Sequence, residues 1–270
     1  MSSSAAHTSL SSPHVSGLQP RASVFFLYHE LTRQKADYAY AFTVEEFSSH
    51  LELFRSIRSD ANAFWPEITF DDGHISNLDL AVPLLTSVGI TAHFFITVGW
   101  TGNRQHYMSW QQLAELHRAG HQIGAHGWSH TLLTKCSDTE LDRELSSSRL
   151  LLEEKLGVPV DTMSLPGGRF NRRVLTACER AGYNHIFTSI PRAETSPSAL
   201  LLGRVNLRDH ASVPWIESLL HPDSNLLRTL ARQHRMKETL QRALGDRLYA
   251  KLWALLNRPQ DGDADDSLTA

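Results

Sequence analysis

The chain has 270 residues, 41% of them hydrophobic and 20% charged, so it is long enough to bury a sizeable core and does not resemble a disordered chain. Its formal net charge of −3 and isoelectric point near 6.6 lack the basic excess of nucleic-acid-binding proteins, and we expect no nucleic-acid partner. Its two cysteines form no CxxC pair, which argues against a disulfide framework or a cysteine zinc cluster.

The first 22 residues are rich in serine and contain no continuous apolar segment of the kind found in secretory signals. No apolar run in the chain approaches the roughly 18 residues that a membrane-spanning helix requires. We therefore expect a disordered segment over residues 1–22 and a cytoplasmic protein.

From Ser23 onward, short apolar runs alternate with longer amphipathic ones, a pattern typical of strands and helices around a parallel sheet. The predicted strands are 24–28, 67–70, 92–97, 122–125, 162–164, 185–188 and 202–206. The predicted helices are 44–57, 76–88, 109–119, 138–156 and 172–181. Two of them begin with capping-box spacing, Thr43 with Glu46 and Ser137 with Glu140.

About seven consecutive units of strand and helix predict an α/β fold over residues 23–221, a distorted or incomplete (β/α) barrel of parallel strands. An open, doubly wound parallel sheet is the alternative. In either fold the functional site lies at the carboxyl ends of the strands. Residues that directly follow a predicted strand are therefore the first candidates for functional roles.

Residues 222–258 differ in composition from the rest of the chain, and their composition predicts a basic helical extension. Between Ser224 and Arg258 there are eight Lys or Arg against two acidic residues, a net charge of +6, and leucines recur at helical spacing. We expect C-terminal amphipathic helices, two in number and broken near Gly245. They either pack on the barrel with a solvated basic face or contact an anionic membrane surface or a partner through 224–258. The acidic tail 259–270 is expected to be disordered.

Asp71 and Asp72 end the predicted strand 67–70 within the sequence ITFDDGHISN. Taken alone, an Asp-Asp-Gly sequence is most simply a turn that caps the following helix. Because successive residues at a strand end point in different directions, one carboxylate is also free to bind a cation while the other faces a substrate.

The sequence IGAHGWSH contains His126, which directly follows the predicted strand 122–125, and His130. Their i, i+4 spacing predicts two imidazoles on one face of a helical turn, at the same end of the barrel as the aspartates. Two histidines and one carboxylate form a three-ligand site with open positions, which is typical of a catalytic metal centre.

These motifs resemble the polysaccharide deacetylase family, the carbohydrate esterases of family four that share the chitooligosaccharide deacetylase homology domain. The resemblance rests on TFDDGHISN and HGWSH, with ITAHFFIT and MSWQQLAELHRAGHQIGAH between them and FLYHEL before them. It extends from about Phe25 to about Asn206, in the family's order and spacing.

The resemblance implies roles for four residues. Asp71 is the general base, and Asp72, His126 and His130 hold a divalent metal. We expect zinc, although cobalt, nickel and manganese also suit two imidazoles and a carboxylate. Such a cation lowers the pKa of water and polarises an amide carbonyl.

The family's third motif is usually an Arg-x-Pro-x-Gly loop, and here it reads SLPGGRF. It keeps Pro166 and Gly168 and places Gly167 where the resemblance implies an oxyanion-binding amide. A structural Pro-Gly turn is the simpler interpretation of the glycines. Ser164 stands where the arginine would be, and Arg169 is a candidate replacement for the missing guanidinium.

The histidine that serves many family members as general acid is absent from the corresponding strand, LLGRVNL. His29, His185 and His210 are candidates because they lie near predicted strand ends, and each is otherwise a structural or surface histidine. Alternatively, the water at the metal or Asp71 itself returns the proton.

The function that the resemblance implies is metal-dependent hydrolysis of N-acetyl groups from amino sugars of a poly- or oligosaccharide or a lipid-linked precursor, as in exopolysaccharide biosynthesis, with release of acetate. His74, Trp100, Tyr107 and Trp128 are candidates to line a sugar cleft. The altered third motif leaves open the deacylation of another amide or an imide, and the missing acid leaves open a non-catalytic carbohydrate-binding protein.

Overall fold

The structure, a computed structural model, describes residues 21–196 and 198–256. Most of the predicted disordered segment 1–22 and all of the predicted tail 259–270 lie outside the described residues. The chain divides between Leu227 and Arg228 into two compact units, which are described separately.

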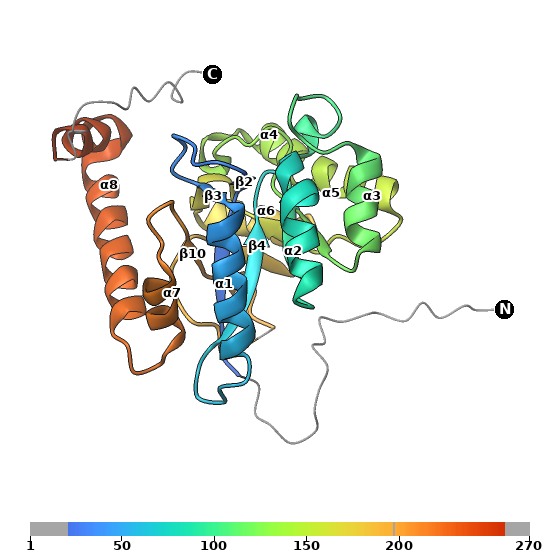
Figure 1. Cartoon of the computed structure of the whole chain (residues 1–270). Helices are drawn as coiled ribbons and strands as arrows, with labels where there is room; N and C mark the ends of the chain where they lie inside the picture. Colours follow the sequence, from blue (N-terminus) through green and yellow to red (C-terminus); the bar gives the residue numbers. More distant parts are fainter. Residues whose placement is uncertain (1–20, 197, 257–270) are drawn as a thin grey trace. The chain divides into compact units, whose positions relative to one another are not determined.

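The first unit is built on a parallel sheet of eight strands, which confirms the predicted distorted (β/α) barrel (Figure 1). The strands lie in the order β10-β1-β4-β5-β6-β7-β8-β9, and each hydrogen-bonded pair is parallel. They are β1 (Ser23–Tyr28), β4 (Trp65–Phe70), β5 (His93–Ile96), β6 (Gln122–Ala125), β7 (Thr162–Ser164), β8 (His185–Phe187), β9 (Leu201–Leu202) and β10 (Arg204–Asn206).

The two edges of this sheet are consecutive pieces of the chain, separated only by Gly203. β9 pairs with β8, and β10 pairs with β1, so the seventh predicted strand bends at Gly203 and brings the edges together into a nearly closed barrel. A side chain at Gly203 would meet the Ile190 carbonyl oxygen and lie 2.6 Å from Arg192 Cγ. Glycine is therefore required where the chain passes from one edge to the other.

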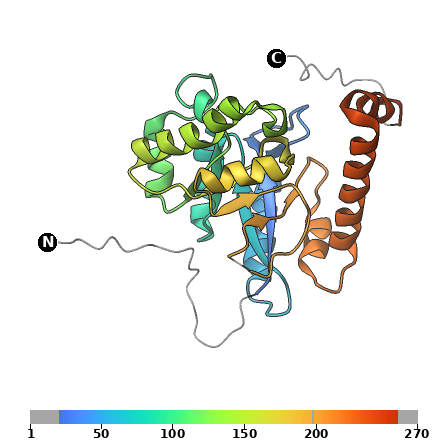
Figure 2. The same cartoon turned by 180° about the vertical axis from the view of Figure 1, so that it is seen from behind.

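Helices cover the outside of the barrel, with α1 and α2 toward the viewer in Figure 1 and α6 (yellow) on the side that Figure 2 turns forward. They are α1 (Val44–Ile57), α2 (Val82–Ser87), α3 (Trp110–Arg118), α4 (Asp138–Asp142), α5 (Ser148–Leu156), α6 (Arg172–Arg180) and α7 (Val213–Leu220). π-helical turns η1 (Asn77–Ala81) and η4 (Arg143–Ser147) precede α2 and α5. Both predicted capping boxes are confirmed, at Thr43 and Ser137.

Two short strands and one α-helix of this unit were not predicted. β2 (Glu30–Thr32) and β3 (Ala41–Thr43) form a small parallel pair, and α7 packs against α1. Strands of three residues are too short to show an alternating pattern, so their sequence carries little signal.

The second unit contains helix α8 (Leu226–Leu256) from Arg228 onward. The predicted break near Gly245 is wrong, because a single helix runs through that position. A glycine inside a helix costs about 1 kcal/mol relative to alanine, which strong helix formers on either side offset. Among the described residues, no helix combines the length and the apolar content needed to cross a bilayer.

The barrel interior has an aromatic layer and a polar layer. Phe25, Phe95, Phe187 and Leu202 form a buried cluster. The guanidinium of Arg204 lies 5.4 Å from the ring centre of Phe95 and 5.8 Å from that of Phe187. The polar groups that Arg204 contacts belong to the candidate site.

Candidate active site at the carboxyl ends of the strands

The neighbouring carboxylates Asp71 and Asp72 point to different partners. The amide of Asp71 donates to the Tyr28 carbonyl (3.1 Å) and so continues the ladder between β1 and β4. Asp72 has a positive φ of 76°, which is unusual for a residue other than glycine. This local conformation turns Asp72 toward His126 and His130, whereas Asp71 pairs with Arg204 and lies farther from His126, with 3.8 Å between Oδ2 and Nε2. The division relieves the repulsion between adjacent charges.

Asp72, His126 and His130 form the one group of three potential metal ligands found among the described residues. One ligand atom from each lies within 4.8 Å of the other two. Asp72 Oδ1 lies 3.4 Å from the Nε2 atom of each histidine. The structure thus brings together the three residues that the resemblance assigns to the metal.

The protonation of these groups fits a cation between them. His126 Nδ1 donates to the Ser164 carbonyl (2.9 Å), so Nε2 of the neutral ring is an acceptor. Burial lowers the pKa of His126 to about 3, which keeps the ring neutral. Its Nε2 faces Asp72 Oδ1, a buried oxygen without a hydrogen-bond partner in the described part of the chain. Two acceptors that face one another repel unless a proton or a cation lies between them, and a bound cation would satisfy both.

Burial also raises the pKa of Asp72, to about 6, because nothing in the protein fully compensates its charge. A divalent cation bound between Asp72, His126 and His130 would supply that compensation. The donor set of two imidazole nitrogens and one carboxylate suits zinc and several other transition metals.

The two-histidine loop (residues 126–130) is not the helical turn that the i, i+4 spacing predicts. Its residues have no helical assignment, and Gly127 and His130 have positive φ values of 78° and 65°. The two rings nevertheless lie 5.0 Å apart. Backbone in a strained region, here and at Asp72, persists only where the surroundings determine it, and it is common at functional sites.

Asp71 is held by a buried network that the sequence did not predict. Arg204 Nη1 donates to Asp71 Oδ1 (2.8 Å) and Nη2 to Oδ2 (2.9 Å), a bidentate pair, and Ser164 Oγ donates to Oδ2 (2.9 Å). Arg204 is 1% exposed and Asp71 3%. Burial by itself would raise the pKa of Asp71, but Arg204 and His126 bring it well below its ordinary value. Asp71 therefore remains ionised.

Arg204 also explains the departure in the third motif. Its Nη2 contacts Ser164 Oγ at 2.7 Å, at the position where the family pattern has arginine. The guanidinium beside Asp71 thus comes from β10, and the expectation that Arg169 supplies it is wrong. The sequence feature that could have indicated this role is the single arginine in the apolar run LLGRVNL, because a charge in a buried strand needs a buried partner.

The three candidate general acids lie in different places. His29 directly follows β1, one position beyond the Tyr28–Phe70 pair, and so is next to Asp71. Burial lowers the pKa of His29, against the raising effects of Asp72 and Asp71. Its Nδ1 is buried without a hydrogen-bond partner among the described residues, and its carbonyl accepts from Asn77 Nδ2 (2.7 Å).

The other two candidates are not brought to the site. His185 is the first residue of β8, so it lies at the opposite end of the barrel, where its Nδ1 bonds the Ala199 carbonyl (3.1 Å). The prediction for His185 used its closeness to a strand end. That end is the amino end of β8, whereas the site lies at the carboxyl ends of the strands. The side chain of His210 is 77% exposed and pairs with Asp209 (3.5 Å).

The third-motif loop is a 3-10 turn, η5 (Pro166–Gly168), beside the two-histidine loop. The Gly168 amide donates to the Leu165 carbonyl (2.8 Å), which leaves Gly167 as the candidate oxyanion donor. Gly167 has a positive φ of 62°, and a side chain there would lie 2.7 Å from Leu132.

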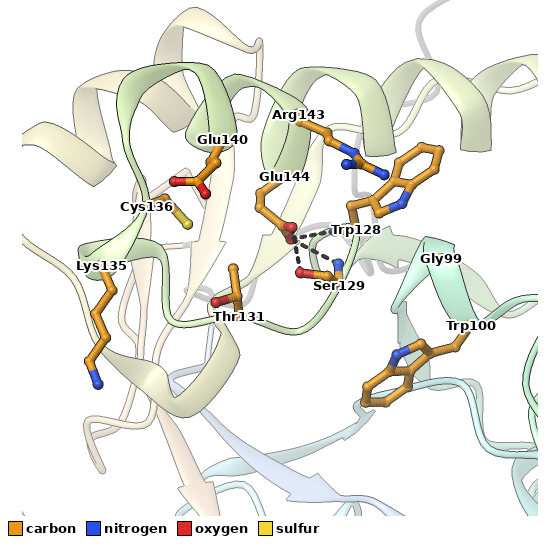
Figure 3. Close-up of a pocket in the computed structure, with 10 residues that line it drawn as sticks. All are labelled: Gly99, Trp100, Trp128, Ser129, Thr131, Lys135, Cys136, Glu140, Arg143 and Glu144. Carbon is orange, nitrogen blue, oxygen red and sulfur yellow. Dashed lines mark hydrogen bonds between the residues drawn. The ribbon is translucent and has the colours of Figure 1, made fainter. Parts of the chain in front are cut away.

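Aromatic rings form a wall that leads to the metal ligands. His74 contacts Tyr107 (5.7 Å between ring centres), Tyr107 contacts Trp100 (4.7 Å), and Trp100 contacts His130 (5.2 Å). Trp100 and Trp128 also line a pocket of about 430 Å³ on the flank of the two-histidine loop (Figure 3). Its other lining residues are Gly99, Ser129, Thr131, Lys135, Cys136, Glu140, Arg143 and Glu144.

Residues 65–186 match the model of the polysaccharide deacetylase family. Among curated proteins, the chain is 31% identical over 123 residues to a peptidoglycan-N-acetylglucosamine deacetylase of Bacillus cereus, covering 45% of this chain and 55% of that protein. It is 29% identical over 123 residues to a chitin deacetylase of a Pestalotiopsis species, covering 46% and 41%. The chain thus spans about half the length of these two curated relatives.

Solved structures show the same fold. The Streptococcus pyogenes deacetylase PplD in complex with acetate superposes with a TM-score of 0.66 at 18% identity, covering 75% of this chain and 100% of that one. IcaB from Ammonifex degensii superposes with a TM-score of 0.64 at 21% identity, covering 74% and 97%.

Proposed function

We propose that this chain, whose residues 65–186 match the model of the polysaccharide deacetylase family, is a metal-dependent hydrolase that removes N-acetyl groups from amino sugars of a poly- or oligosaccharide. The observation that carries the proposal is the convergence of Asp72, His126 and His130 beside the buried, ionised Asp71. A binding protein would have little use for this combination.

In this proposal Asp72, His126 and His130 hold a divalent ion, for which zinc is the first candidate. When bound, such an ion makes water more acidic and polarises the acetamide carbonyl. His126 is oriented for this role by the Ser164 carbonyl, and Asp72 by its left-handed backbone. The Gly167 amide is the proposed donor to the oxyanion.

Asp71 is the proposed general base. A carboxylate offers about four lone-pair positions, and three accept hydrogen bonds here, two from Arg204 and one from Ser164. Both positions of Oδ2 are used, so the remaining position lies on Oδ1 and is the one that can take a proton from water. Arg204 and Ser164 fix the carboxylate while it does so.

His29 is the proposed proton donor to the leaving amine. It is the one candidate of the three that lies beside Asp71 and Asp72. Burial lowers the pKa of His29, and the charges of Asp72 and Asp71 offset only part of that effect. We expect His29→Gln to reduce turnover by about 10²–10⁴-fold, the contribution typical of general acid catalysis, with unchanged metal content. His185→Gln and His210→Gln are the matched controls and should keep kcat. Wild-type turnover in His29→Gln would remove His29 from the mechanism.

The pocket and the aromatic wall support a saccharide substrate, because flat rings with a few polar groups suit the faces and hydroxyls of sugars. Acetate release from N-acetylglucosamine oligomers, measured with and without a chelator, tests the proposal. We expect release that the chelator abolishes. Opening of cyclic imides without acetate release would favour the alternative deacylase, and inactivity on both classes with metal bound would favour a carbohydrate-binding protein.

We also propose that α8 supports peripheral contact with an anionic membrane surface. Its described part carries exposed basic residues at Arg228, Arg232, Arg235 and Lys237, together with Met236, which is 71% exposed. Co-sedimentation with anionic but not with neutral vesicles is expected. Equal recovery in the supernatant with both would contradict this contact.

A further inference from the structure

Glu144 is a buried carboxylate that the proposed reaction does not use. It is 5% exposed and lies in the π-helical turn η4, within the helical segment that joins α4 to α5. Ser148 Oγ donates to the Glu144 carbonyl (2.6 Å) and the Leu145 carbonyl (2.9 Å), and Tyr183 Oη also donates to the latter (2.9 Å). Side chains therefore stabilise this widened turn, and such turns often occur at functional sites.

The Glu144 carboxylate binds the two-histidine loop through both of its oxygens. Oε2 accepts from the amides of Trp128 (2.7 Å) and Ser129 (2.9 Å), and Oε1 accepts from Ser129 Oγ (2.6 Å) (Figure 3). Bonds of this kind to an ionised acceptor are about twice as strong as those between neutral groups. A negative charge is thus fixed inside the loop that carries both histidine ligands.

Backbone contacts hold the same loop from another element. Val98 donates to the Gly127 carbonyl (3.1 Å), and Gly99 donates to the Trp128 carbonyl (2.8 Å). A side chain at Gly127 would lie 2.8 Å from Glu144 Oε2, so the close approach of the carboxylate depends on a glycine there. Two amides of the loop, those of Trp128 and Ser129, therefore bond Glu144, whereas the Gly127 and Trp128 carbonyls bond the segment after β5.

His130 needs this support because its backbone is in a left-handed conformation with φ of 65°. A non-glycine residue holds such a conformation only when neighbouring contacts determine it. That conformation places His130 Nε2 at 3.4 Å from Asp72 Oδ1. If the bonds to Glu144 were lost, the loop would relax and the third ligand would leave the assembled set.

We infer that Glu144 is a positioning residue for the metal centre, which acts through the amides of Trp128 and Ser129 to preassemble His126 and His130. The inference rests on the proposed metal site and deepens it. Groups that orient metal ligands typically contribute 10–100-fold to metal affinity. Glu144 would do so without touching either imidazole.

The test is the affinity of the metal-free, full-length protein for zinc, measured by competition with a chromophoric chelator. We expect Glu144→Ala to bind zinc about 10–100-fold more weakly than wild type. Glu144→Gln retains an oxygen for the two amides and loses the charge, so its loss should be smaller. Glu153→Gln is the matched control, because Glu153 lies on α5 and also accepts from a backbone amide, that of Val160 (2.9 Å). It should leave zinc affinity unchanged.

Thermal unfolding of the metal-free proteins separates positioning from general stability. A merely structural role would lower the melting temperature of metal-free Glu144→Ala and leave its zinc affinity unchanged, which would overturn the inference. If Glu144→Ala does not fold, Glu144→Gln and Ser129→Ala decide by the same criterion. Wild-type protein that binds neither zinc nor cobalt, nickel or manganese would refute the proposed metal site itself, and this inference with it.

Discussion

Arg204→Met is expected to reduce turnover strongly and to destabilise the barrel. The variant leaves the Asp71 carboxylate buried without its bidentate partner, and breaking a buried ion pair in this way costs about 3–5 kcal/mol. Asp71 would then take up a proton, and the loss of a general base reduces turnover by about 10²–10⁴-fold. Chemical denaturation and acetate release measure the two effects.

The double variant Asp71→Asn/Arg204→Met is the control for the ion pair. It removes both charges, so it should recover part of the stability but none of the activity. In wild type the pair holds the folded pKa of Asp71 below its unfolded value, so its stabilisation is present at neutral pH and is lost as the pH falls through the folded pKa. Full stability and turnover in Arg204→Met would contradict the role given to this residue.

Asp71→Asn is expected to lose about 10²–10⁴-fold in turnover while it keeps the metal. The substitution preserves shape but removes the proton acceptor, and Asp72, His126 and His130 remain in place. Metal content and kcat, measured on the same preparation, test the separation of the two carboxylates.

The exposed Asp79→Asn variant is the matched control for removal of one carboxylate and should behave as wild type. Undiminished kcat in Asp71→Asn would show that another group accepts the proton. Loss of the metal would show that Asp71 belongs to the ligand set.

The parts of the fold that could be predicted are those whose residues repeat a pattern. The barrel strands and most helices have apolar periodicity, and the capping boxes at Thr43 and Ser137 fixed two helix starts. The short strands β2 and β3 carry too few residues for a pattern, and the unbroken α8 shows that one glycine does not end a helix formed by strong helix formers.

The site could be predicted where residues able to bind a metal follow the end of a predicted strand in the sequence, as Asp72, His126 and His130 do. What could not be predicted depends on contacts between distant segments. Arg204 is 133 positions from Asp71, and only the closure of the barrel through Gly203 brings β10 beside β1. The same reasoning failed for His185, because adjacency to a strand does not say which end of the barrel a residue occupies.

Metal analysis of purified, dialysed protein tests the central claim most directly. We expect one divalent ion per wild-type chain, and loss of that ion in Asp72→Ala and in His130→Ala, because each removes one of three ligands. A wild-type protein that binds no divalent ion, or variants that retain it in full, would contradict the account.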